Sequence, residues 1–271
     1  MIHNILKIQY HYISNISNPI HIGYGIDENY ARCCATSIAS FCINNPKTIF
    51  CFHIMSKDLS ISTKNKFQQL AKMYSININI YEINTDNLLN LLTQVHLPIA
   101  TYFRFILPMI LKDIDKLFYI DADIICLKKA LDLFNIDVFN KVQKAISKEP
   151  KKFRYLDQDA LNLILTKQIN YINSKFNCLD INNINISDII LLHFAAHPKP
   201  WNIAFPISKA CNNFTKNLYK NYENQTPWKN TPLDMPRNYK EYKIYAKTLK
   251  NNSQYTKSIY WLLKYLVNKF N

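Results

Sequence analysis

Strand-like and helix-like segments alternate from residue 20 onward, and this order constrains the fold more than any other feature of the sequence. Residues 21–26, 48–55 and 76–83 are apolar runs typical of buried strands, and residues 28–45 and 60–75 between them have the apolar spacing of helices. Parallel strands need long crossover connections, which are usually helical. The alternation therefore predicts an α/β fold, with helices flanking a mostly parallel sheet.

The alternation continues for one more unit and then weakens. Residues 102–111 are predicted to form a helix and residues 116–120 a strand. Further along, residues 155–167 look helical and residues 188–195 look like a strand. Residues 241–271 place Lys between Tyr, Trp and Leu at helical spacing, which indicates either a helix on an anionic membrane surface or one packed on its own domain.

Composition excludes several classes of function. Only two glycines, Gly23 and Gly25, occur among 271 residues, which argues against a glycine-rich phosphate loop. Seven cysteines without Cys-x-x-Cys spacing are typical of reduced thiols in a cytosolic protein. No signal peptide or run of about 18 apolar residues is found, so we expect the chain to stay in the cytoplasm.

The net charge of +14 has two interpretations. It indicates either a solvated basic surface or an affinity for anionic lipid, phosphorylated glycan or nucleic acid. Arg is scarce and no nucleic-acid-binding module is recognisable, so we expect no nucleic-acid partner.

Two carboxylates follow the strand predicted at residues 116–120. Asp121 and Asp123 would be costly to bury unpaired, so they either face water in a turn or share a cation. A hard divalent ion such as Mn²⁺ or Mg²⁺ prefers oxygen ligands, and a diphosphate supplies more of them. His193, at the end of a predicted strand, is a candidate third ligand, and Lys199 can complement a phosphate.

Five motifs in order carry a family resemblance, and a sixth fits it. They are GIDENY (25–30), HLPIATYFR (96–104), FYIDADIIC (118–126), YLDQDALN (155–162), HFAAHPKPW (193–201) and, later, TPWKNTPLD (226–234). This sequence resembles glycosyltransferase family 8, most closely the bacterial lipopolysaccharide core glucosyl- and galactosyltransferases. The similarity covers most of residues 20–240.

The resemblance implies a GT-A-like fold and a retaining transfer of glucose or galactose from UDP-glucose or UDP-galactose to a lipopolysaccharide core acceptor, with Mn²⁺ or Mg²⁺. It implies a cytoplasmic protein, peripheral on the inner face of the bacterial inner membrane. The expected organisation is an N-terminal extension (1–19), a nucleotide-sugar-binding and catalytic domain (20–205), and a basic, aromatic, helical C-terminal region (206–271) that can associate with the membrane.

The same resemblance implies roles for the substrate-binding residues. Asp27, Asn29 and Tyr30 would hold the uracil and ribose of the donor. Arg104 would contact its sugar or diphosphate, and His96 would face the acceptor.

It also implies the metal ligands and the catalytic residues. The implied metal ligands are Asp121, Asp123 and His193. Asp121 would also contact the ribose, and Lys199 would bind the diphosphate. Asp157 and Gln158 would lie beside the donor sugar, with Gln158 near the reacting anomeric face.

Two departures from the family pattern leave a second interpretation open. Ala196 and Asn202 stand where family members have Gly and His. Only residues 124–156 separate the two acidic motifs, whereas relatives have a longer stretch that includes an apolar Phe-Asn-x-Gly-Val segment. The alternative is therefore a catalytically impaired remnant that retains at most UDP and metal binding.

Overall fold

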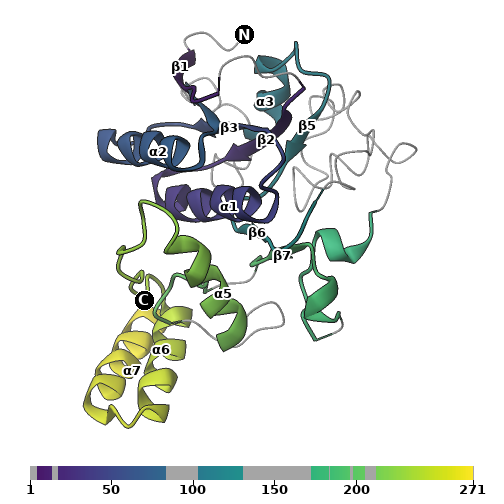
Figure 1. Cartoon of the computed structure of the whole chain (residues 1–271). Helices are drawn as coiled ribbons and strands as arrows, with labels where there is room; N and C mark the ends of the chain where they lie inside the picture. The colour runs from purple at the N-terminus through teal and green to yellow at the C-terminus, as the bar shows by residue number, and fades with distance from the viewer. Residues whose placement is uncertain are drawn as a thin grey trace, which may run out of the picture.

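A five-stranded sheet with strand order β1-β4-β3-β2-β5 forms the centre of the molecule (Figure 1). The structure, a computed structural model, describes residues 5–13, 18–83, 103–130, 172–182, 184–195, 198–204 and 212–270. The strands are β1 (Ile5–Tyr10), β2 (Ile20–Gly25), β3 (Phe50–Ser56), β4 (Asn77–Ile83) and β5 (Leu117–Tyr119). Strands β2 to β5 pair in parallel, and β1 pairs antiparallel to β4. The predicted mostly parallel α/β fold is confirmed.

Helices cover both faces of this sheet. On one face lie α1 (Ala31–Asn44) and α2 (Ile61–Tyr74), and on the other lies α3 (Phe103–Ile110) (Figure 1). Helix α1 is buried along most of its length, because its small residues let it lie between the sheet and the helix α5. At Gly23, an added Cβ would lie 2.3 Å from Leu107 Cδ2, so the absent side chain lets α3 approach β2 closely.

A second, two-stranded sheet extends the core beside α1. Strands β6 (Ile124–Cys126) and β7 (Leu191–His193) pair antiparallel, and the first residue of β6 lies opposite the last residue of β7. Two short 3-10 turns, η7 (Ser174–Phe176) and η8 (Ile186–Asp188), precede β7. This pairing fixes the end of β7 beside the turn that precedes β6.

Three helices complete the described chain. They are α5 (Asn213–Glu223), α6 (Tyr239–Asn251) and α7 (Tyr255–Phe270). Helix α5 packs on α1, whereas α6 and α7 form a pair that projects away from the sheet (Figure 1). Among the described residues, no helix combines the length and the apolarity that a bilayer span requires.

Helix α7 packs on α6 and leaves much of its apolar surface exposed. Ser258 Oγ donates to the Ala246 carbonyl at 2.7 Å, and the Trp261 ring contacts those of Tyr242 and Tyr245. On α7 the side chains with 41–77% exposure include Ile259, Leu262, Leu263, Leu266, Val267 and Phe270.

Two sequence-based predictions of elements need comment. Strand β1 lies within the stretch expected to be an N-terminal extension, and the sequence did not predict it. The sequence did not reveal it because so short an edge strand has little apolar alternation. Its pairing partner β4 also lies far along the chain. The helix predicted at residues 155–167 lies outside the described residues.

Candidate active site

The carboxyl edge of the parallel sheet carries the first of the predicted site residues. Asp27 follows β2, and its Oδ1 accepts a hydrogen bond from the Tyr30 backbone N–H at 2.9 Å. This bond caps η1 (Glu28–Tyr30), the 3-10 turn that leads into α1. Asp121 follows β5, the strand that neighbours β2. Ligands of open α/β sheets bind beyond this edge.

Asp121, Asp123 and His193 meet at one point. His193 Nε2 lies 3.3 Å from Asp123 Oδ1 and 3.9 Å from Asp121 Oδ2. One ligand atom from each residue falls within 4.8 Å of the others. The β6–β7 pairing produces this arrangement, and Phe194 N–H donates to the Asp123 carbonyl at 3.0 Å. Two carboxylates and an imidazole at this spacing can hold one divalent ion.

A neighbouring amide orients the imidazole. His193 Nδ1 lies 2.9 Å from Asn177 Oδ1, which can only accept, so Nδ1 donates a proton to it. Nε2 faces the two carboxylates, 3.3 Å from Asp123 Oδ1, so it is the nitrogen that would bind an ion, in place of a proton shared with Asp123. The sequence did not single out Asn177, because one Asn in an Asn-rich chain carries no distinguishing pattern.

Lys199 lies against the buried carboxylate of this group. Its Nζ is 2.5 Å from Asp123 Oδ2 and 2.7 Å from the Phe194 carbonyl oxygen. Burial alone would raise the pKa of Asp123, but the hydrogen bond from His193 and the Lys199 charge outweigh it and lower this pKa to about 2. Asp123 is therefore an anion at neutral pH although only 7% of its surface is exposed.

Arg104 and Asp121 form a second, more open pair. Arg104 Nη2 lies 3.4 Å from Asp121 Oδ1, and the guanidinium lies over the Tyr119 ring at 5.1 Å. A basic side chain thus lies beside each carboxylate of the cluster, in addition to His193. With this positive charge already beside the two acids, a divalent cation is best accommodated together with an anion.

Tyr30 lines the same region. Burial raises the pKa of its hydroxyl, and Cys33 and the charges of Asp123, Asp27 and Asp121 raise it further. Its ring makes an edge-on contact with Trp201 at 6.0 Å.

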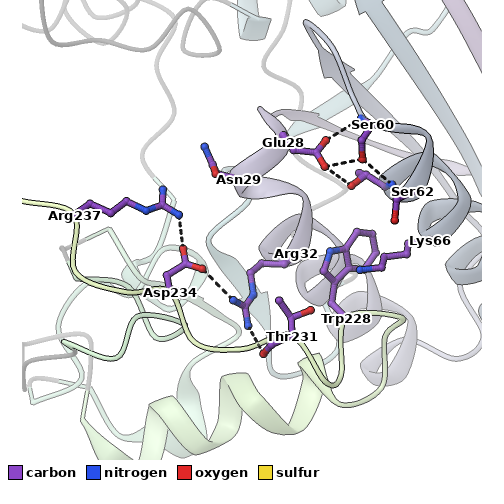
Figure 2. A pocket seen from close by; sticks show the side chains of 11 residues that line it. Glu28, Asn29, Arg32, Ser60, Ser62, Lys66, Trp228, Thr231, Asp234 and Arg237 are labelled. Carbon is purple, nitrogen blue, oxygen red and sulfur yellow. Dashed lines mark hydrogen bonds and ion pairs between the residues drawn. The ribbon is translucent and has the colours of Figure 1, made fainter.

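Asn29 lines a separate hollow of about 250 Å³ on the outer side of η1 (Figure 2). The hollow is walled by α2, by the start of α1 and by the segment after α5, and the labelled side chains include Arg32, Lys66, Trp228 and Arg237 (Figure 2). The residues that line it do not include the Asp121–Asp123–His193 cluster.

Of the remaining residues that the sequence analysis singled out, the structure describes Asn202 and leaves four others outside its described part. Asn202, at the position of a family His, is buried, and its Nδ2 donates to Glu241 Oε2 at 3.3 Å while its Oδ1 accepts from the Ala204 N–H at 2.8 Å. His96, Asp157, Gln158 and Ala196 lie outside the described residues.

The sequence is similar to those of known lipopolysaccharide glycosyltransferases. Lipopolysaccharide 1,3-galactosyltransferase of Salmonella typhimurium (strain LT2) is 26% identical over 318 aligned residues, which cover 93% of this chain and 92% of the relative. Lipopolysaccharide glucosyltransferase WaaO of Escherichia coli (strain K12) is 26% identical over 316 residues, covering 92% and 91%.

Solved structures show the same fold. An active-site mutant of LgtC superimposes with a TM-score of 0.59 at 16% identity, covering 77% of this chain and 96% of LgtC. The galactosyltransferase LgtC in complex with donor and acceptor sugar analogues gives a TM-score of 0.54 at 15% identity, with the same coverage. These likenesses identify the GT-A fold.

Family models match nearly the whole chain. The model of glycosyl transferase family 8 matches residues 21–154 and 138–204, and the model of the family's C-terminal region matches residues 215–269. The predicted resemblance is therefore confirmed, and the chain belongs to glycosyltransferase family 8.

Proposed function

We propose that this protein transfers glucose or galactose, with retention, from a UDP-sugar to a lipopolysaccharide core oligosaccharide, with Mn²⁺ or Mg²⁺ bound by Asp121, Asp123 and His193. The observation that carries the proposal is the convergence of these three side chains, with the imidazole oriented by Asn177. The relatives named as lipopolysaccharide galactosyl- and glucosyltransferases, similar over more than 90% of the chain, support the acceptor class.

The residues present fit a divalent ion. The ligand atoms are two carboxylate oxygens and one imidazole nitrogen, a set that suits Mn²⁺ or Mg²⁺ when substrate oxygens complete the shell. When bound, the ion supplies positive charge where the leaving diphosphate develops negative charge. Lys199 and Arg104 add fixed positive charge at the same place, and their carboxylate partners hold them in position.

The remaining assignments are part of the same proposal. Asp27, Asn29 and Tyr30 bind the uracil and ribose. The position of Asp27 and Tyr30 at the turn after β2 supports this, whereas the role of Asn29, which lines the separate hollow, rests on the family motif alone. Asp121 also contacts the ribose, and Lys199 binds the diphosphate.

Three further residues complete the proposed site. Asp157 and Gln158 flank the donor sugar, with Gln158 beside the anomeric carbon. His96 faces the acceptor. These roles rest on the family motifs alone.

We also propose that the C-terminal region, residues 206–271, holds the enzyme on an anionic membrane at the cytoplasmic face, where its lipid-linked acceptor is made. Helix α7 exposes a row of large apolar side chains, and Lys257, Lys264 and Lys269 lie on the same helix. Lys264 Nζ is 4.8 Å from the centre of the Trp261 ring, which places a cation beside an interfacial aromatic. Apolar insertion together with lysine charge is the pattern of helices that lie on anionic lipid.

One observation favours a second candidate, a catalytically impaired member of the family. The alignment to the Salmonella relative runs over 318 positions but uses 93% of a 271-residue chain, so many residues of the relative face a gap here. The two matches to the family model overlap at residues 138–154, which supports a shortened interval between the two acidic motifs. Such a chain would bind UDP and metal without turnover.

A transfer assay decides between the two candidates. The full chain is incubated with Mn²⁺, UDP-glucose or UDP-galactose and a truncated lipopolysaccharide core, and UDP release and sugar incorporation are followed. The expected result is acceptor-dependent turnover with one donor, lost in Asp123→Asn and kept in Asp188→Asn, a matched change at an exposed carboxylate. Metal-dependent UDP binding without turnover would instead establish the impaired form.

A further inference from the structure

Three side chains with soft or borderline ligand atoms meet on the sheet, away from the proposed active site. They are His21 of β2 and Cys51 and His53 of β3, and one ligand atom from each lies within 4.8 Å of the others. The strand register causes this, because His21 pairs with Cys51, and His53 lies two residues further on the same face of β3. His21 is near the amino end of β2, about 20 Å by strand rise from Asp27 beyond its carboxyl end.

The two imidazoles face one another through their ring nitrogens. His21 Nδ1 lies 2.9 Å from His53 Nε2. Two nitrogen ligands of a tetrahedral zinc ion lie about 3.3 Å apart, as follows from a Zn–N distance of about 2.05 Å. A shift of a few tenths of an ångström would therefore admit an ion between them.

Neighbouring groups orient two of the three ligand side chains. His53 Nδ1 lies 3.1 Å from the Tyr81 hydroxyl, which leaves its Nε2 to face His21. Asn79 Nδ2 donates to Cys51 Sγ at 3.2 Å, and an N–H donor to sulfur favours the thiolate. Gln9 Nε2 in turn donates to Asn79 Oδ1 at 2.9 Å, which fixes the direction of that amide.

We propose that His21, Cys51 and His53 form a second metal site that binds Zn²⁺ through two imidazole nitrogens and one thiolate. Such a ligand set suits zinc and disfavours Mn²⁺ and Mg²⁺, which prefer oxygen. The site is thus chemically distinct from the Asp121–Asp123–His193 cluster. Zinc here would tie β2 to β3 in the middle of the sheet and leave one coordination position open.

The protonation states are compatible with binding. Burial, then the neighbouring His21 and Lys7, lower the pKa of His53 to about 3, so its ring is neutral at physiological pH. Burial raises the pKa of Cys51 to about 11, so the free thiol is protonated and zinc must displace that proton. One proton per ion then passes to solvent. His21 is half-buried, whereas Cys51 and His53 are buried.

Cobalt substitution tests the site with a readout independent of transfer activity. The reduced, metal-stripped full chain is titrated with Co²⁺, and thiolate-to-cobalt charge transfer and tetrahedral d–d absorption are recorded. We expect one charge-transfer band per chain, lost on addition of one equivalent of Zn²⁺. The band should disappear in Cys51→Ser and persist in Cys42→Ser, the same change at a partly buried thiol outside the site.

Two further variants make the outcome decisive. Asp123→Asn removes a ligand of the other cluster and should leave the band unchanged, so that failure of the active-site proposal and failure of this one can be told apart. If Cys51→Ser loses its circular dichroism spectrum, His21→Gln takes its place, because His21 is only half-buried, and should weaken Co²⁺ binding at least tenfold. A wild-type chain without the band, or a band equally strong in folded Cys51→Ser, overturns the proposal.

Discussion

The ion pair between Arg32 and Glu223 joins residues 21–204 to residues 215–269, the two regions that the family models match separately. Its removal tests how much this contact contributes to the stability of the fold. Arg32 lies at the start of α1, and Glu223 ends α5, 191 residues later. Arg32 Nη2 is 2.8 Å from Glu223 Oε1, with 5% and 0% of the two side chains exposed. The guanidinium also donates to the carbonyl oxygens of Pro232 and Thr231 at 2.9 and 3.3 Å.

Arg32→Met keeps an unbranched apolar stem and removes the charge and the donors of the guanidinium. Glu223 then remains buried, with Lys220 as its remaining cationic partner at 2.6 Å, and the two carbonyls lose a donor. Breaking a buried pair in this way costs about 3–5 kcal/mol of unfolding free energy. A loss of 1 kcal/mol lowers the melting temperature of a chain near this size by about 2–4 °C, so the melting temperature should fall by roughly 6–20 °C.

Urea denaturation followed by circular dichroism and tryptophan fluorescence measures this loss. The matched control is Arg237→Met, since Arg237 pairs with Asp234 at 3.0 Å but is 58% exposed, and we expect a cost below about 1 kcal/mol there. Arg32→Met/Glu223→Leu should recover part of the loss, because no buried charge is left unpaired. Equal costs for Arg32→Met and Arg237→Met would refute the reasoning.

Three further predictions concern single side chains. Asn177→Ala should weaken Mn²⁺ binding, measured by calorimetry, about 10–100-fold without changing the melting temperature by more than a few degrees, and unchanged affinity would contradict the orienting role. Gly23→Ala should destabilise the chain by about 1–3 kcal/mol in urea, because its Cβ would overlap Leu107, and a neutral effect would mean that α3 can move aside. Ser60→Ala removes the oxygen that accepts from the Thr63 N–H at 3.1 Å and should cost about 1 kcal/mol by the same measurement; no loss would show that Glu28 replaces the cap.

Local patterns in the sequence were sufficient for the order of the elements. The apolar runs and amphipathic spacing that predicted β2, β3, β4, α1 and α2 act over a few residues, and the structure has each element in place. The same holds for the two acids after β5, because a polar pair directly after a strand lies at the edge of a parallel sheet.

Strand β1 and Asn177 show the limits of this reasoning. Each takes its role from a partner far along the chain, β4 for the first and His193 for the second. Neither the residues of an edge strand nor an amide side chain in a turn form a local sequence pattern from which the distant partner can be predicted.

What the sequence by itself determined is therefore the family, the fold class and the residue types of the proposed metal site. The tertiary structure decided which of these residues meet. The β6–β7 pairing brings His193 to Asp123, and the β2–β3 register brings His21 to Cys51. Pairing between distant segments depends on how whole elements pack, since burial and register are properties of the assembled core and not of any short stretch of chain.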